Sequence, residues 1–88
     1  MVQEHESSLA FMPPRFGEFR KVLSRNGFEL VRKRGDHEIW TLTADDGRVS
    51  NRVPVSHGNA QIRTQRLFSD MLAQCGKTEQ HFYEVLRG

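Results

Sequence analysis

Hydrophobic positions recur with helical spacing near the start of this chain. Between about Phe16 and Asn26 the apolar residues fall three or four positions apart, at Phe16, Phe19, Val22 and Leu23. This spacing is typical of an amphipathic helix with one face towards the core. Gly27 follows as a residue that readily ends a helix in the left-handed conformation. The pattern therefore predicts a first helix over about 16–26.

Three strand-like segments follow this helix. They cover 28–34, 37–43 and 48–55. Gly35-Asp36 separates the first two and is a two-residue hairpin signal, because glycine supplies the positive φ that such a turn needs. Ala44-Asp45-Asp46-Gly47 provides a second turn. The pattern predicts a three-stranded antiparallel meander.

The short Gly35-Asp36 turn fixes the expected register of the first hairpin. Antiparallel pairing sets Arg34 opposite His37 and Arg32 opposite Ile39. The same register pairs Lys33 with Glu38 and Val31 with Trp40. His37 therefore shares a sheet face with Arg32 and Arg34.

The inward face of this hairpin has two candidates. The first set of apolar residues is Val31, Trp40 and Leu42, and the second is Phe28, Leu30 and Ile39. If Trp40 faces inward, His37 and its arginines face solvent; if Ile39 does, His37 lies at the sheet edge beneath a helix. The third strand alternates, with Val49, Val53 and Val55 on one face and Arg48 and Arg52 on the other.

Two further helices are expected after the meander. Thr64 can cap the second helix, whose apolar face comprises Leu67, Phe68, Met71, Leu72 and Cys75, and Gly76 closes it. Thr78 starts a short last helix with Phe82, Val85 and Leu86 as its buried stripe. Arg63 and Arg66 lie at the first turn of the second helix, where cations oppose the helix dipole. They indicate either contact with phosphate or a solvated helix end.

This order of elements predicts an α+β domain in which helices cover one face of a three-stranded antiparallel sheet. The arrangement α-β-β-β-α, with a short C-terminal helix, is that of a double-stranded-RNA-binding-like fold. We assign residues 16–88 to this domain. Residues 1–15, which contain Pro13-Pro14, are expected to form a flexible N-terminal arm.

Composition limits the class of protein. A chain of 88 residues with 36% apolar content makes one small domain. The single cysteine, Cys75, allows no intramolecular disulfide and no multi-cysteine metal site. No apolar run approaches the roughly 18 residues of a membrane span, and no signal peptide is recognisable. We expect a cytoplasmic protein without membrane contact; its net charge of +2 permits an anionic partner without requiring one.

His37 is the principal candidate for chemistry. An imidazole titrates near neutral pH and can take or give a proton, while neighbouring guanidinium groups can hold a phosphate. This combination suits phosphodiester chemistry, although a single histidine on a strand is usually only a half-exposed polar residue. His37, His57, His81 and Cys75 lack close ligand spacing, so no metal site and no cofactor are expected.

Several motifs together resemble the HicA-type toxins of bacterial and archaeal toxin–antitoxin pairs. The resemblance runs from about Phe16 to Leu86 and is carried by Asn26-Gly27-Phe28, Gly35-Asp36-His37-Glu38-Ile39-Trp40, Val53-Pro54-Val55, His57-Gly58-Asn59 and Cys75-Gly76. The Gly-x-His motif followed by an aromatic residue is the most specific of these in its context.

This resemblance implies a toxin that cleaves messenger RNA and is inhibited by a cognate HicB-type antitoxin. The catalytic histidine of the family corresponds to His37, and Gly35 is the turn glycine beside it. The expected RNA-binding residues are Arg32, Lys33, Arg34, Gly35, Arg63 and Arg66.

The corresponding mechanism is metal-independent. The 2′-hydroxyl of the RNA attacks the adjacent phosphate, His37 moves the proton, and Arg32 or Arg34 stabilises the developing charge. His57 is the candidate helper, because one histidine serves poorly as both acid and base. The alternative is a non-catalytic domain of the same fold that binds structured RNA or docks an antitoxin.

Overall fold

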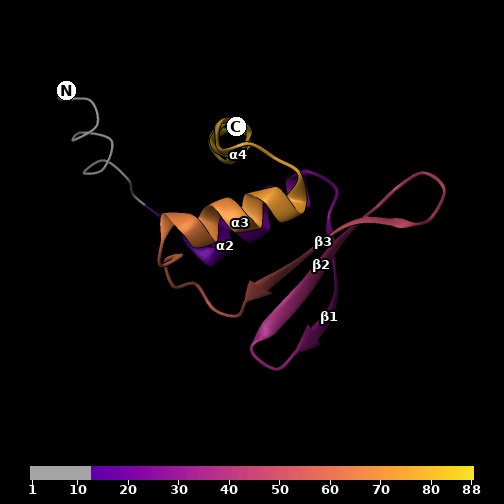
Figure 1. The fold of residues 1–88 in the computed structure, drawn as a ribbon, viewed down its shortest axis with the longest axis horizontal. Coiled ribbons are helices and arrows are strands. Elements are labelled where there is room, and N and C mark those ends of the chain that lie inside the picture. The colour runs from indigo at the N-terminus through magenta and orange to yellow at the C-terminus, as the bar shows by residue number, and fades with distance from the viewer. Residues whose placement is uncertain (1–12) are drawn as a thin grey trace.

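The computed structural model describes residues 13–88, so most of the predicted N-terminal arm lies outside the described residues. The elements are α2 (Phe16–Arg25), β1 (Glu29–Arg34), β2 (His37–Thr43), β3 (Val49–Ser56), α3 (Gln65–Cys75) and α4 (Glu79–Arg87). The strands form one antiparallel sheet in the order β1-β2-β3 (Figure 1). This confirms the predicted α+β fold and its double-stranded-RNA-binding-like arrangement.

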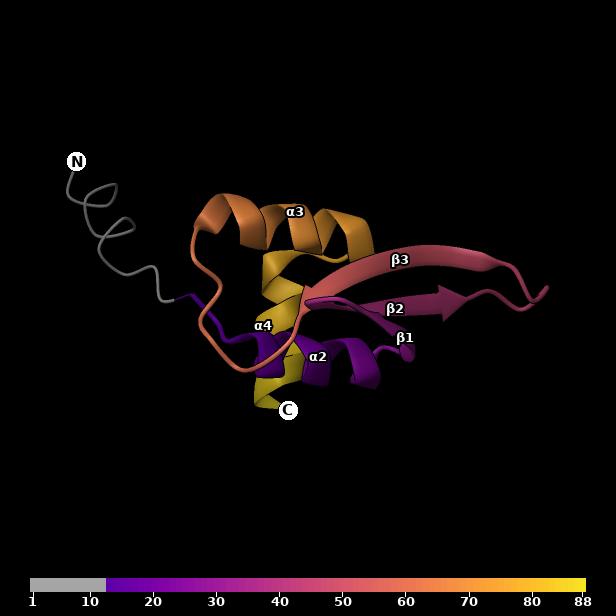
Figure 2. The same cartoon turned by 90° about the horizontal axis from the view of Figure 1, so that it is seen from below.

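The helices gather on one side of the sheet and leave its other face open (Figures 1 and 2). Val53 and Val55 of β3 face this helical layer and are fully buried. Phe19, Phe68 and Phe82, one from each helix, meet in the centre of the core, with ring centroids 5.0 to 6.2 Å apart. In the described part of the chain, no helix has the length and apolar character needed to cross a membrane.

The helix ends follow the local signals of the sequence. The Thr64 side chain accepts a hydrogen bond from Leu67 N (3.0 Å), and the Thr78 side chain accepts one from His81 N (3.1 Å). Gly76 follows α3 with a φ of 72°, the left-handed conformation that ends a helix without a side-chain clash. These observations confirm the predicted starts of the last two helices and the predicted end of α3.

The first hairpin has the predicted register only near its turn. Arg34 pairs with His37 and Arg32 with Ile39, as expected. The predicted pairing of Val31 with Trp40 is wrong, because the register shifts between Leu30 and Arg32 and Leu30 takes the place opposite Trp40. A bulge adds one residue to β1 at this point and leaves Val31 unpaired and 53% exposed.

Neither predicted apolar set forms the inward face as a whole. Trp40 and Leu42 pack against the core, together with Phe28 from the second set. Ile39 lies on the opposite, open face, because side chains alternate along β2. With Trp40 inward, His37 is exposed on the open face, as the first alternative anticipated.

Two apolar side chains predicted to be inward are exposed instead. Val49 is 58% exposed, because a second register shift at Thr43 separates it from the alternation of Val53 and Val55. Leu67 of α3 is 38% exposed, at the margin of the face that Phe68 and Met71 bury.

The segments that lead into α2 and α3 lie side by side. Ile62 N donates to Pro14 O (2.8 Å), and Phe16 N donates to Ala60 O (3.0 Å). Arg15 and Gln61 form an isolated antiparallel bridge between these two bonds. The loop after β3 is therefore held against the start of α2. The boundary proposed at residue 15 remains a prediction.

Candidate functional site

His37 is the first residue of the central strand and lies at the end of the sheet. Gly35, with a φ of 57°, makes the turn immediately before it. In the sheet His37 pairs with Arg34 of β1 and with Ser56 of β3. Directly opposite residues project to the same face, so these three side chains share the open face.

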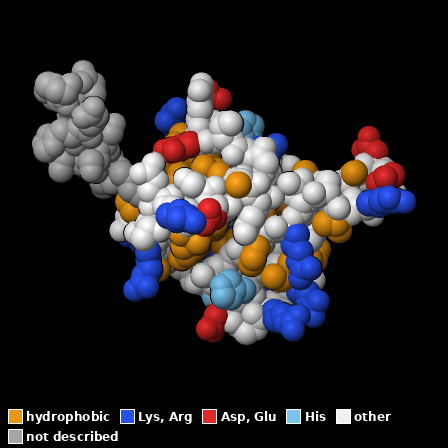
Figure 3. All heavy atoms as spheres, viewed as in Figure 1, with side chains coloured by type: hydrophobic (Ala, Val, Ile, Leu, Met, Phe, Trp, Pro, Cys, Tyr) orange, Lys and Arg blue, Asp and Glu red, His pale blue; other side chains and the backbone are white. Residues whose placement is uncertain are grey.

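The open face around His37 combines cationic and apolar side chains. Arg34, His37, Ile39 and Pro54 line a shallow hollow. Arg32 is the next residue of β1 on this face, and it borders a second hollow over Ile39. On the face seen in Figure 3, a pale-blue histidine lies beside orange hydrophobic side chains, and blue cations gather near them towards the lower edge. Such a surface can hold a phosphate beside a proton-transfer group.

A groove begins on the other side of His37, between β3 and α3. It is lined by Phe16, His37, Pro54, Ser56, Leu67, Asp70, Met71 and Gln74. Half of these residues are apolar, and Asp70 and Gln74 are spaced one turn apart on its helical wall. The exposure of Leu67 is explained by this groove, since its side chain faces the hollow instead of the core.

The other predicted cations do not gather at His37. Lys33 pairs with Glu38, so it projects to the face opposite His37. Arg63 is exposed in the loop before α3. Arg66 is exposed on α3, where its Nε lies 3.7 Å from Asp70 of the groove wall. The structure therefore unites Arg32 and Arg34 with His37, whereas Arg66 is connected with the groove only through its ion pair with Asp70.

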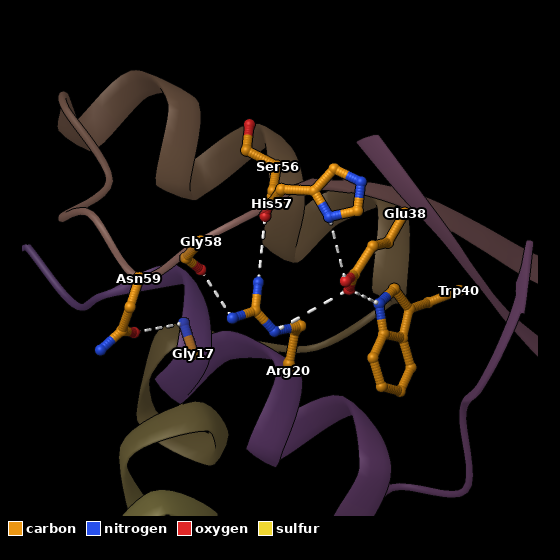
Figure 4. Close-up of polar contacts among 8 residues, drawn as sticks. All are labelled: Gly17, Arg20, Glu38, Trp40, Ser56, His57, Gly58 and Asn59. Carbon is orange, nitrogen blue, oxygen red and sulfur yellow. Dashed lines mark hydrogen bonds and ion pairs between the residues drawn. The ribbon is translucent and has the colours of Figure 1, made fainter. Parts of the chain in front are cut away.

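Behind the turn, on the helix-covered face, lies a buried carboxylate. The Glu38 side chain is only 11% exposed, and its Oε1 accepts a hydrogen bond from Trp40 Nε1 (3.1 Å). Arg20 Nε of α2 lies 3.8 Å from Oε1, and His57 Nδ1 lies 3.3 Å from Oε2 (Figure 4). Two basic side chains thus flank one carboxylate. We refer to Arg20, Glu38 and His57 as the Glu38 cluster.

The same arginine also holds the loop that follows β3. Arg20 Nη1 donates to Ser56 O (3.0 Å), and Nη2 donates to Gly58 O (2.6 Å). Beside it, Gly17 N donates to Asn59 Oδ1 (2.9 Å; Figure 4). The backbone of residues 56–59 is therefore attached to α2 at several points.

A protein-family model described as the HicA toxin of bacterial toxin-antitoxin matches residues 16–76, well over half of the chain. The chain belongs to the HicA toxin family. Membership makes it the toxin component of a toxin–antitoxin system and implies a cognate antitoxin partner. A comparison with curated proteins finds no match.

The residues that the HicA family model matches include both faces of the site. His37, the Glu38 cluster and α3 all lie within the matched residues, whereas α4 lies beyond them. His57, predicted as a helper of His37, projects to the helix-covered face with Glu38. The structure therefore does not bring the two histidines together on the open face.

Sequence reasoning missed Glu38 and Arg20 as site residues of this HicA protein. In both cases the sequence pattern placed the charged residue at an inward position. Glu38 alternates with Trp40 and Leu42, which face the core, and Arg20 lies four residues after Phe16, one helical turn along the buried stripe of α2. A charged residue at an inward position indicates a buried ion pair.

Cys75 takes no part in this site. Burial raises the pKa of its thiol above the ordinary value, and Sγ donates to Leu72 O (3.4 Å). Within residues 13–88, no three side chains of His, Cys, Asp or Glu gather as a group suited to hold a metal ion.

Proposed function

We propose that this HicA toxin is an endoribonuclease that cleaves messenger RNA, with His37 as its proton-transfer group and without a metal ion. One observation carries the proposal: His37 is exposed on the open sheet face and is directly paired with Arg34. Arg32 lies farther along the same face. A base or acid beside guanidinium groups suits phosphodiester cleavage without a metal ion.

In the proposed reaction the RNA supplies its own nucleophile. The 2′-oxygen forms a bond to the adjacent phosphorus while His37 takes the proton of the hydroxyl. The bond between phosphorus and the 5′-oxygen breaks, and the leaving 5′-oxygen takes a proton from solvent on this exposed face. The products are a 2′,3′-cyclic phosphate and a 5′-hydroxyl. Arg34 stabilises the negative charge that develops on the phosphate oxygens.

The groove between β3 and α3 gives the RNA a path away from His37. We propose that it holds the base next to the cleaved phosphate. Its apolar lining residues suit the face of an unstacked base, and Asp70 and Gln74 offer hydrogen-bonding groups for the base edge. Arg66 is exposed beside Asp70 and Arg63 is exposed in the loop before α3, and both can contact the backbone of the same strand.

The proposed antitoxin is of the HicB type and presents an acidic surface to the open face. Arg34 then contributes both to RNA contact and to the toxin–antitoxin complex. Arg34→Glu is expected to weaken the two interactions together, because it reverses the charge that both anionic partners meet.

The deciding experiment incubates labelled single-stranded RNA with the purified protein in excess EDTA and resolves the products on a denaturing gel. We expect His37→Ala to lower the cleavage rate by about 100- to 10,000-fold, the usual contribution of a general acid–base group. Arg34→Ala is expected to lower it about 100-fold. Arg48→Ala is the matched control, because Arg48 is also exposed but lies at the β2–β3 turn, beside Asp46.

Three results would contradict the proposal. Intact RNA with the wild-type protein, on several RNA sequences, would favour an RNA-binding or antitoxin-docking domain. Cleavage that persists in His37→Ala would move the chemistry to another residue. Cleavage that requires added Mg²⁺ would refute the metal-independent mechanism.

A further inference from the structure

A buried charge lies directly behind the histidine proposed to act on RNA. Glu38 follows His37 in the sequence and projects to the opposite face, where its side chain is 11% exposed. Removing a carboxylate from water costs several kcal/mol unless other charges and donors compensate. Arg20, His57 and Trp40 provide this compensation from α2, the loop after β3 and β2 itself. An apolar residue at position 38 would avoid this desolvation cost, so the buried charge of Glu38 needs a functional explanation.

The contacts of the Glu38 cluster reach three of the four backbone neighbours of His37; the fourth, Arg34, pairs with His37 from β1. The residue after His37 is Glu38 itself. The residue before it is Asp36, whose carbonyl accepts a hydrogen bond from His57 N (3.0 Å). The cross-strand partner on β3 is Ser56, whose carbonyl accepts a hydrogen bond from Arg20 Nη1 (3.0 Å).

The cluster therefore connects three separate segments around one residue. Arg20 comes from a helix, whereas Asp36 belongs to an exposed turn and Ser56 to the end of a strand. Turns at the end of a sheet are held less firmly than its centre. A proton-transfer group must nevertheless stay within hydrogen-bond reach of the substrate, and a displacement of about 1 Å can lower the rate about 100-fold.

We infer that Arg20, Glu38 and His57 are positioning residues that hold the backbone of His37 in the orientation required for proton transfer. The inference rests on the proposed ribonuclease function. The side chains of the cluster meet on the helix-covered face, so it acts on the substrate only through His37. Its loss is expected to reduce kcat and to leave RNA binding by Arg32 and Arg34 intact.

The first test compares steady-state kinetics of RNA cleavage by wild-type protein and Glu38→Gln, a variant of nearly unchanged shape. We expect kcat to fall about 10- to 100-fold, and KM to stay within about threefold. Asp46→Asn is the matched control, because it removes an exposed carboxylate that also pairs with an arginine, at the far turn of the sheet. Far-UV circular dichroism and thermal melting establish that each variant is folded.

Arg20→Lys provides a second variant in case Glu38→Gln does not fold. Lysine keeps the charge but lacks the planar fork that reaches the carboxylate and two carbonyls at once. It should lower kcat by a similar factor. Because both residues act through the same backbone, the double variant should lose little more than the more affected single variant.

A readout independent of cleavage separates this inference from the proposed function. In a ¹H–¹⁵N spectrum, Glu38→Gln should shift or broaden the Asp36 and His37 amide signals and leave those of Arg48 and Val49 unchanged. If wild-type protein cuts no RNA, the proposed function fails, and these spectra alone decide whether the cluster fixes His37. Unchanged Asp36 and His37 signals would overturn the inference, as would a wild-type kcat in Glu38→Gln or a loss confined to KM.

Discussion

Replacing Phe82 by alanine tests whether α4 belongs to the core. Phe82 is 0% exposed, and its ring centroid lies 5.3 Å from that of Phe19 and 5.0 Å from that of Phe68. A buried phenylalanine removes about 150–250 Å² from water. At about 25 cal/mol per Å² this corresponds to about 4–6 kcal/mol, an upper estimate.

Measured truncations of buried phenylalanines support a similar value, about 3–5 kcal/mol, because a cavity remains. A domain of this kind has a free energy of unfolding of about 5–15 kcal/mol. Phe82→Ala should therefore remove a large part of the stability and lower Tm by at least about 12 °C.

Urea unfolding followed by fluorescence measures this loss directly, because Trp40 is the single tryptophan and packs against the core. Leu67→Ala is the control within a neighbouring helix. Its side chain is partly exposed, so we expect a loss below about 1.5 kcal/mol. A free energy of unfolding for Phe82→Ala within about 1 kcal/mol of wild type would refute the three-ring packing and the docking of α4.

Three further predictions concern other parts of the molecule. Burial raises the pKa of the Cys75 thiol, so little reactive thiolate exists at neutral pH. Thiol reagents should therefore react slowly with the folded protein and rapidly with protein unfolded in guanidinium. Equal reaction rates in the two conditions would contradict this prediction. Gly17→Ala should lower the free energy of unfolding, measured in urea, by about 1–3 kcal/mol, because the new Cβ would collide with the Asn59 side chain that Gly17 N binds. Unchanged stability would show that the loop around Asn59 can move aside without cost. Gln74→Ala should change which base is preferred beside the cut, measured by sequencing cleavage ends, whereas identical ends would exclude the groove as a base site.

The order of elements could be predicted because its signals are local. Helical spacing of apolar residues, Thr64 and Thr78 as caps, and Gly76 after α3 each act within one or two turns of the chain. The two-residue turn likewise fixes the pairing of Arg34 with His37, since no residue intervenes that could shift the register.

The errors arose where the structure departs from regular alternation. A bulge adds one residue to a strand without leaving a recognisable mark in the sequence, so Val31 was assigned the wrong partner and Val49 the wrong face. Leu67 was assigned to the core because the periodicity of a helix does not distinguish a packed residue from one that borders a groove.

The Glu38 cluster could not be assembled from sequence for a different reason. Its members lie on a helix, a strand and a loop, and a charged residue by itself is normally solvated. Only the packing of α2 against the sheet brings Arg20 to Glu38 and to the carbonyl of Ser56. The alternation along β2 indicated that Glu38 faces inward, but not which cations would meet it.

The cations of β1 have a consequence for self-association. β1 is an outer strand, all six of its residues are exposed, and one of its edges pairs with no other strand of residues 13–88. Arg32, Lys33 and Arg34 place three consecutive positive charges on that edge, and two copies approaching strand to strand would repel each other. Under the proposed RNA contact, the polyanion would neutralise these charges and remove this repulsion between two copies.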